Sequence, residues 1–150
     1  MRAVFPSLIR DRSGASLVEF AMIFPVLISM LLGAVQTGFW MQNYNAVRNI
    51  TNDVARFAMV EYQRGNKITN DSIATKADTL AAGAKYQLGA GTFVPKVTDK
   101  PTQVDGVRQL RLDIAYTPPE FMPFVDPAIL TIRYGRDIYL YDANVKAVTP

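Results

Sequence analysis

The sequence contains no histidine and no cysteine among its 150 residues. Histidine most often serves as the general base near neutral pH, and cysteine supplies both a strong nucleophile and a metal-binding thiolate. Their absence removes the commonest catalytic groups and most ligands of transition metals. We therefore expect no enzyme activity, no cofactor and no metal site, and a fold that forms without disulfide bonds.

Glycine-rich phosphate loops and clusters of basic residues are also missing. The glycines at positions 83, 89 and 91 lack the spacing, the following helix and the lysine that such loops require. Three arginines and one aspartate lie within residues 1–14, so the other residues carry only +1 of the net charge of +3. Without a concentrated basic surface for phosphate contacts, we expect no nucleic acid partner.

The sequence does contain one long uncharged segment. No charged side chain occurs in residues 20–35, and extending the segment back to residue 15 adds only Glu19. A helix rises about 1.5 Å per residue and crosses the hydrocarbon core of a bilayer in about 20 residues. We predict one transmembrane helix over residues 15–41, preceded by a basic leader at 1–14.

The flanking charges predict the orientation of this helix. Arg2, Arg10 and Arg12 precede it, whereas the next basic residue is Arg48, and an excess of Lys and Arg marks the cytoplasmic side of a membrane. The N-terminus is therefore expected in the cytoplasm and the C-terminal domain outside it. A cleavable secretory signal is not indicated, because the apolar run is long and is followed by aromatic residues such as Trp40, which anchor helices at headgroup level.

Glu19 is the unusual residue of this segment. A carboxylate within a bilayer costs roughly 2.5–3.5 kcal/mol on insertion scales, so it is expected to meet a partner. A cut after Gly14 would place the new α-amine of Ala15 about one helical turn before Glu19, where the two charges could neutralise each other within or between subunits. Alternatively, Glu19 lies at headgroup depth and reaches water.

The stretch RDRSGASLVEFAMIFP, residues 10–25, resembles the processing region of type IV pilin-like precursors. The closest resemblance is to the TadE-like pseudopilins, or minor pilins, of tight-adherence (Tad, Flp-type) pilus systems. In that family a prepilin peptidase removes a short basic leader after a glycine, and Glu and an aromatic residue follow at mature positions five and six. The resemblance implies cleavage between Gly14 and Ala15, with Arg10 and Arg12 as the topology signal of the leader.

The same resemblance implies roles for three further residues. Glu19 and Phe20 occupy the fifth and sixth mature positions, and Pro25 matches a proline of the pattern, so all three are expected to act in assembly and register. The implied partners are a prepilin peptidase, other pilin or pseudopilin subunits, the pilus assembly platform and membrane lipid. The implied function is structural, in pilus biogenesis and adhesion. The implied location is the bacterial cytoplasmic (inner) membrane, which the protein crosses once with its C-terminal domain in the periplasm, or the pilus itself.

A second interpretation is a single-pass membrane protein that is never processed. In that case Gly14 is a flexible joint at the start of a helix, and Glu19 has no assembly role. The domain outside the cytoplasm would then bind an envelope partner or ligand. The fate of the leader distinguishes the two interpretations.

Beyond the membrane the helix is predicted to continue as an amphipathic extension over residues 42–64. Residues 65–150 are then expected to form an extracytoplasmic domain, which begins with a helix capped by Asn70 or Asp71 and ending near Gln87. The apolar face of the extension consists of residues spaced by three and four: Val47, Ile50, Val54, Phe57 and Ala58.

Three later segments alternate apolar and polar residues with a period of two, which is typical of strands. Asp105 and Gly106 form a turn signal that pairs the first two strands, and Gly135 is expected to form a bulge in the third. With the helices, these strands predict an α+β, pilin-like fold with a small antiparallel sheet. The strands are expected at residues 93–98, 107–117 and 129–141.

A proline-rich stretch, TPPEFMPFVDP, separates the last two predicted strands. Proline donates no hydrogen bond to a sheet, so this stretch is expected to be a loop. Its apolar residues Phe121, Met122 and Phe124 either dock a partner, as exposed apolar side chains often do, or fold back onto the sheet. Both alternatives remain open from the sequence.

Overall fold

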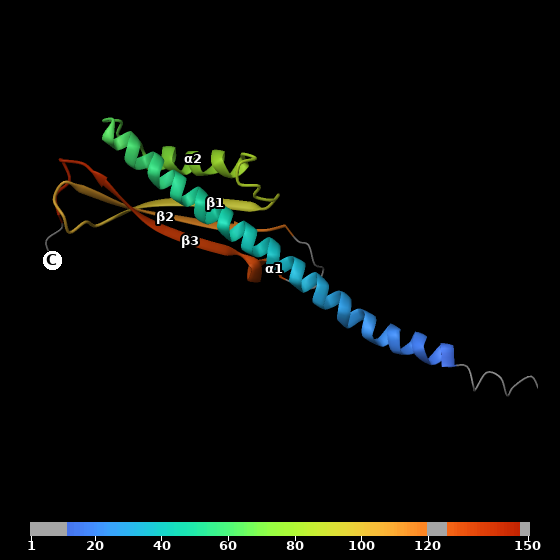
Figure 1. Ribbon diagram of the computed structural model, residues 1–150. Coiled ribbons are helices and arrows are strands. Elements are labelled where there is room, and N and C mark those ends of the chain that lie inside the picture. The colour runs from blue at the N-terminus through green and yellow to red at the C-terminus, as the bar shows by residue number, and fades with distance from the viewer. Residues whose placement is uncertain (1–11, 120–125, 148–150) are drawn as a thin grey trace, which may run out of the picture. The chain divides into compact units, whose positions relative to one another are not determined.

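A computed structural model describes residues 12–119 and 126–147 (Figure 1). These residues form an α+β fold, as predicted. The chain divides into two compact units, one ending at Phe39 and one beginning at Trp40, and each is described by itself. In chain order the elements are α1 (Arg12–Gln63), α2 (Asn70–Ala82), β1 (Thr92–Lys100), β2 (Val107–Thr117), the 3-10 helix η2 (Pro127–Leu130) and β3 (Ile132–Tyr141).

The three strands form one antiparallel sheet in the order β1-β2-β3. The turn between β1 and β2 contains Gly106 at φ +74°, a left-handed conformation that glycine adopts without strain. This confirms the turn predicted at Asp105 and Gly106. The register across the sheet is continuous, because Phe93 pairs with Tyr116 and Tyr116 pairs with Ile132.

One face of the sheet and the two helices enclose the core of the second unit. In β2 the alternation predicted from the sequence is confirmed, because every second residue from Leu110 to Tyr116 is at most 1% exposed. The spacing predicted for α1 is confirmed as well, with the exception of Phe57, which is only half-buried. The helix residues of this hydrophobic cluster are Val47, Ile50, Val54, Ala55 and Ala58 of α1 and Ile73 and Ala77 of α2. Ala46 and Thr51 of α1 are buried as well.

The limits of α2 differ from the prediction at both ends. Its N-cap is Thr69, whose hydroxyl oxygen accepts a hydrogen bond from the amide of Ser72 at 3.2 Å. The two residues predicted as caps lie inside the helix instead. At the other end the helix stops at Ala82, before the predicted limit near Gln87, because Gly83 follows and glycine is costly within a helix.

β3 is regular at Gly135, so the predicted bulge is wrong. Gly135 pairs directly with Asp113 of β2. The glycine leaves room for the ends of the Asp113 and Arg111 side chains, which would have to move to make space for a Cβ at this position. The strand also begins later than predicted, at Ile132, since the preceding residues form η2, whose first turn is capped by the carboxylate of Asp126.

Candidate functional site: the apolar half of the first helix

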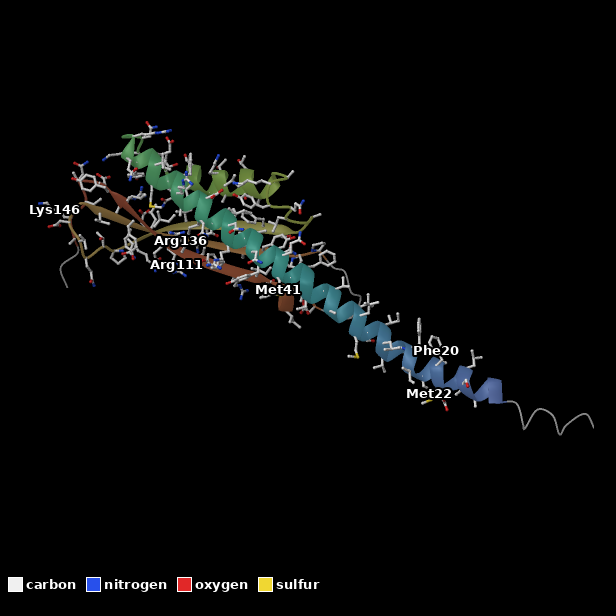
Figure 2. All side chains as sticks on the ribbon, in the orientation of Figure 1. Phe20, Met22, Met41, Arg111, Arg136 and Lys146 are labelled. Carbon is white, nitrogen blue, oxygen red and sulfur yellow. The ribbon has the colours of Figure 1, made fainter. Side chains whose placement is uncertain are left out.

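Within the described residues, the first unit consists of α1 up to Phe39. An 18-residue window of this helix has a mean hydropathy of 2.2, and none of that window is buried. Its large apolar side chains project from the helix, as Phe20 and Met22 do in Figure 2. By length and composition this helix can cross a membrane, and so much uncovered apolar surface calls for lipid or protein against it.

The residues predicted to border the cleavage site, Gly14 and Ala15, lie in the first turn of α1. The first four amide groups of a helix have no acceptor within it, so this turn is the easiest part to unwind. A Cβ at Gly14 would meet no atom within 4 Å, so packing within the described structure does not require glycine here. Glycine weakens a helix by about 0.5–1 kcal/mol relative to alanine, so Gly14 makes this first turn easier to unwind.

Glu19 is exposed on α1, about one helical turn after Ala15. The ring centroids of Phe20 and Phe24 are 5.4 Å apart on the same helix. The residues expected to act in assembly therefore follow one another along a single exposed helix.

The helix continues through Pro25, although proline donates no amide hydrogen bond. Two hydroxyls on the following turns bond back to the helix. Ser29 donates to the carbonyl of Pro25 at 2.7 Å, and Thr37 donates to the carbonyl of Gly33 at 2.9 Å. Lipid offers no hydrogen-bond partner to a hydroxyl, so these internal bonds suit a helix that lies in a bilayer.

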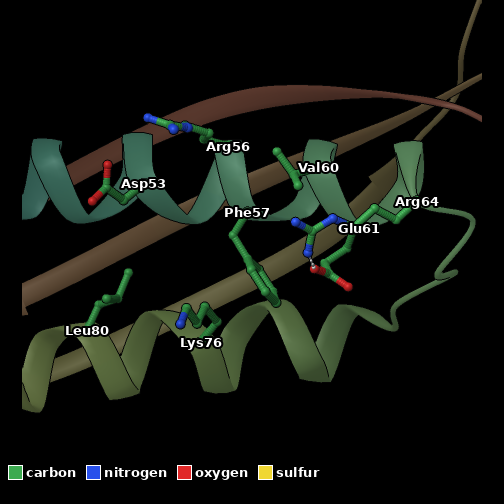
Figure 3. A pocket seen from close by; sticks show the side chains of 8 residues that line it. All are labelled: Asp53, Arg56, Phe57, Val60, Glu61, Arg64, Lys76 and Leu80. Atoms are coloured by element: carbon green, nitrogen blue, oxygen red, sulfur yellow. Dashed lines mark hydrogen bonds and ion pairs between the residues drawn. The ribbon is translucent and has the colours of Figure 1, made fainter.

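The second unit contains a groove of about 450 Å³ between α1 and α2 (Figure 3). Its apolar lining is Phe57, Val60 and Leu80, and Nζ of Lys76 lies 5.2 Å from the centroid of the Phe57 ring. Such a cation over an aromatic face is stabilised by the charge distribution of the ring. The other lining residues are Asp53, Arg56, Glu61 and Arg64.

The carboxylates of this groove are already paired. Asp53 accepts hydrogen bonds from Nζ of Lys85, at 2.8 Å, and from the hydroxyl of Tyr86. The bond from Lys85 is the main cause of the lowered pKa of Asp53. Glu61 accepts a hydrogen bond from Asn66 at 2.7 Å. The groove therefore offers contact area and cations, and neither carboxylate is held free as a general base would be.

The face of the sheet opposite the core carries a separate group of ion pairs. Arg111 donates from Nε to Asp113 at 3.0 Å and from Nη1 to Asp137 at 3.3 Å. Lys100 lies 3.3 Å from the same carboxylate of Asp137. Partly exposed pairs of this kind contribute little stability each, so this group orders the face of the sheet more than it stabilises the fold.

Comparison with known protein families gave one match, which covers most of α1. Residues 14–56 match the family model described as TadE-like protein. The N-terminal segment is TadE-like. The match begins at Gly14 and ends within the amphipathic half of α1, so it covers neither α2 nor the sheet. It confirms the resemblance found in residues 10–25 and links the segment to Tad pilus-associated, pilin-like proteins, which are structural and not enzymatic. Comparisons with curated proteins and with solved structures gave no match.

Several predicted site residues lie outside what the structure describes. Arg10 of the leader and the loop residues Phe121, Met122 and Phe124 are in this group, and their roles remain predictions. Sequence reasoning also missed the groove between α1 and α2. The sequence hinted at it only through Phe57, a large apolar residue directly after the charged Arg56, and both residues line the groove.

Proposed function

We propose that this protein is a minor pilin or pseudopilin of a Tad-type pilus, inserted in the bacterial cytoplasmic membrane and active in pilus biogenesis. One observation carries the proposal: the match over residues 14–56 begins with an apolar, unburied stretch of α1, and in residues 14–39 the one charged residue is Glu19. A family match alone would leave the anchor unexplained, and an apolar helix alone would fit any single-pass protein.

In this proposal a prepilin peptidase cleaves between Gly14 and Ala15, and the arginines of the leader hold the N-terminus in the cytoplasm. The position of this bond in the first turn of α1 supports the proposal, because that turn can unwind into a peptidase at little cost. Residues 15–41 stay in the membrane as the anchor, and the domain from residue 65 onward lies on the periplasmic side. No catalytic step is assigned to the chain.

Glu19 supplies register when subunits assemble. An unpaired carboxylate in lipid is unfavourable, and cleavage supplies two kinds of complementary charge, the α-amine of Ala15 in the same chain and that of a neighbouring subunit. The register role is the pairing with the neighbour. Only one axial stagger of two subunits brings these charges together. Phe20 and Pro25 lie on the same helix within two turns, and they take part in the same helix-to-helix contact. The assembly platform is the expected site of this pairing.

The loop residues Phe121, Met122 and Phe124 are proposed to dock a protein partner of the pilus. Three large apolar residues close together in the sequence of a predicted loop are typical of a contact site. The alternative, in which they fold back onto the sheet, makes them part of the core and leaves the first helix as the contact with other subunits.

Replacing Glu19 tests the assembly role. Glu19→Ala and Glu19→Gln are expected to insert in the membrane normally and to reduce pilus production strongly, because both remove the charge. Met22→Ala is a matched control, since Met22 is 74% exposed on the same helix and carries no charge. Normal pilus production from both Glu19 variants would rule out the register role.

The rival function is an unprocessed membrane-anchored domain that binds an envelope partner. The groove between α1 and α2 favours a binding role of this kind, because it combines apolar and cationic side chains. A protein that keeps its leader in cells with an active prepilin peptidase would support the rival.

A further inference from the structure

Ile129 is 77% exposed, more than any other large apolar side chain that the structure describes. It lies in η2, and hydrogen bonds within residues 126–131 fix the shape of this short helix. The carboxylate of Asp126 accepts from the amide of Ala128 at 2.8 Å, and the amide of Thr131 donates to the carbonyl of Ala128 at 3.3 Å. A single exposed isoleucine is ordinary by itself, so the residues around Ile129 decide whether it has a partner.

η2 lies at the end of the second unit where α1 enters it. Tyr134, near the start of β3, contacts Tyr44 of α1 edge to face, with ring centroids 6.1 Å apart. Tyr44 in turn stacks on Trp40, with centroids 5.6 Å apart. Trp40 directly follows the apolar unit. A row of three aromatic rings therefore joins the point where the chain leaves the apolar segment to the strand that follows η2.

This end of the unit has the composition of a membrane–water interface. Tryptophan and tyrosine are enriched at headgroup level, where an apolar ring and a polar edge are both accommodated. Two exposed cations lie next to these tyrosines in the chain. Arg48 is one helical turn after Tyr44, and Arg133 directly precedes Tyr134. Cations near the surface of anionic lipid are attracted to it. Val104 is comparably apolar and 59% exposed but lies in the turn between β1 and β2, at the opposite end of the sheet.

We propose that η2 is a second membrane contact, in which Ile129 enters the headgroup region of the leaflet from which α1 emerges. The partner is a lipid surface, because Trp40 and Tyr44, which link this end of the unit to β3, directly follow the segment that crosses the bilayer. The inference rests on the proposed function only in requiring that residues 15–35 span the membrane. Its consequence is that the second unit is held at the bilayer by two points instead of one.

The absence of cysteine from the chain makes a clean test possible. Three single variants of the full chain, Ile129→Cys, Val104→Cys and Leu27→Cys, are labelled with an environment-sensitive fluorophore. Each is reconstituted into vesicles of phosphatidylcholine and phosphatidylglycerol. Quenching is then measured with nitroxide-labelled lipid and, separately, with aqueous iodide.

The label at Ile129 is expected to be quenched several-fold more by nitroxide lipid than the label at Val104, and less by iodide. Equal quenching of these two labels by iodide would overturn the inference. A label at Ile129 that neither reagent reaches would also overturn it, in favour of contact with protein. Leu27 separates this failure from failure of the proposed function, since its label reports the spanning helix alone. Iodide quenching of all three labels would contradict both.

Discussion

Arg108 of β2 donates a hydrogen bond from Nη2 to Oδ1 of Asn70, the first residue of α2, at 3.0 Å. The same guanidinium donates from Nε to Asp99 of β1 at 2.8 Å and from Nη1 to the hydroxyl of Tyr62 near the end of α1. One side chain thus connects two strands and both helices of the second unit. Asp99 responds to this contact, because hydrogen bonds from Asn70 and Arg108 outweigh the effect of burial and lower its pKa.

Replacement of Arg108 is therefore expected to destabilise the second unit. Arg108→Met keeps the apolar stem but removes three hydrogen bonds, and bonds to charged groups contribute roughly 1.5–3 kcal/mol each at most. Because the site is partly exposed, we expect a loss of about 2 kcal/mol in the free energy of unfolding. Urea unfolding of the full chain in detergent, followed by circular dichroism, measures this loss. Arg133→Met, at an exposed position of β3, is the control and should change little; equal losses in both variants would contradict this role of Arg108.

Two glycines are expected to differ in how much stability is lost when alanine replaces them. A Cβ at Gly91 would collide with the backbone carbonyl of Thr117 and lie 2.7 Å from the Tyr116 ring, and neither group can move easily. Gly91→Ala should therefore cost about 1–3 kcal/mol, as overpacking typically does.

At Gly135 the crowded atoms are the ends of the Asp113 and Arg111 side chains, which can rotate away. Gly135→Ala should therefore change stability by less than about 1 kcal/mol, because weak ion pairs are lost while the unfolded chain becomes less flexible. Urea midpoints of the two variants check both expectations. A Gly135→Ala variant less stable than Gly91→Ala would show that the ion pairs matter more than the packing.

Alkaline pH should weaken the contact of α1 with the segment that follows α2. The hydrogen bond with Asp53 is the main cause that raises the pKa of Lys85 from 10.5 to about 12, and burial, followed by the bond to Asp53, raises the pKa of Tyr86. Both groups have a higher pKa in the fold than in the unfolded chain. Their contribution is therefore complete below the unfolded values and is lost as the pH rises towards 12. The difference in stability between wild type and Asp53→Asn should shrink over this range; a constant difference would contradict the pairing.

Acidic pH should weaken the same contact, because it protonates Asp53. The pKa of Asp53 is lowered below 3.8, mainly by the hydrogen bond from Lys85. Its contribution is present above the unfolded pKa and is lost as the pH falls through the folded value. The stability advantage of wild type over Asp53→Asn is thus expected to be greatest around neutral pH and to decline below about pH 4. Unfolding curves at several acidic pH values measure this decline.

The fold class was predictable because burial imposes its period directly on the sequence. Alternation in β2 and the spacing of Val47, Ile50 and Val54 in α1 each reflect one buried face. The contacts between elements were not predictable in this way. Arg108 and Asn70 are 38 positions apart, and Lys85 and Asp53 are 32 apart, so their pairing depends on how helices and sheet pack. Gly135 was misread for the same reason, since its crowding comes from a neighbouring strand.

The candidate site on the first helix was predictable from the sequence, whereas the groove and the exposed Ile129 were not. The residues from Gly14 to Pro25 are recognisable because they follow one another along a single helix, and their chemistry is local. The groove and the exposed Ile129 are not, because each depends on which side chains the packed elements leave uncovered. Exposure of one isoleucine just after a proline-rich stretch has no signature in the sequence.

The variant Gly14→Arg is expected to keep residues 1–14 even where a prepilin peptidase is active. A glycine at the cut allows close approach of an enzyme to the backbone, and arginine would obstruct it. The mass of the protein purified from membranes reports this directly. Removal of the leader from Gly14→Arg would show that cleavage does not depend on this residue.

The central claim is tested most directly by the intact mass of the unaltered protein, isolated from membranes with and without a co-expressed prepilin peptidase. The account predicts that the peptidase removes residues 1–14 and leaves Ala15 as the first residue, whereas the full chain persists without it. Retention of the leader beside a peptidase that processes another pilin in the same cells would contradict the account, and the register role of Glu19 would fall with it.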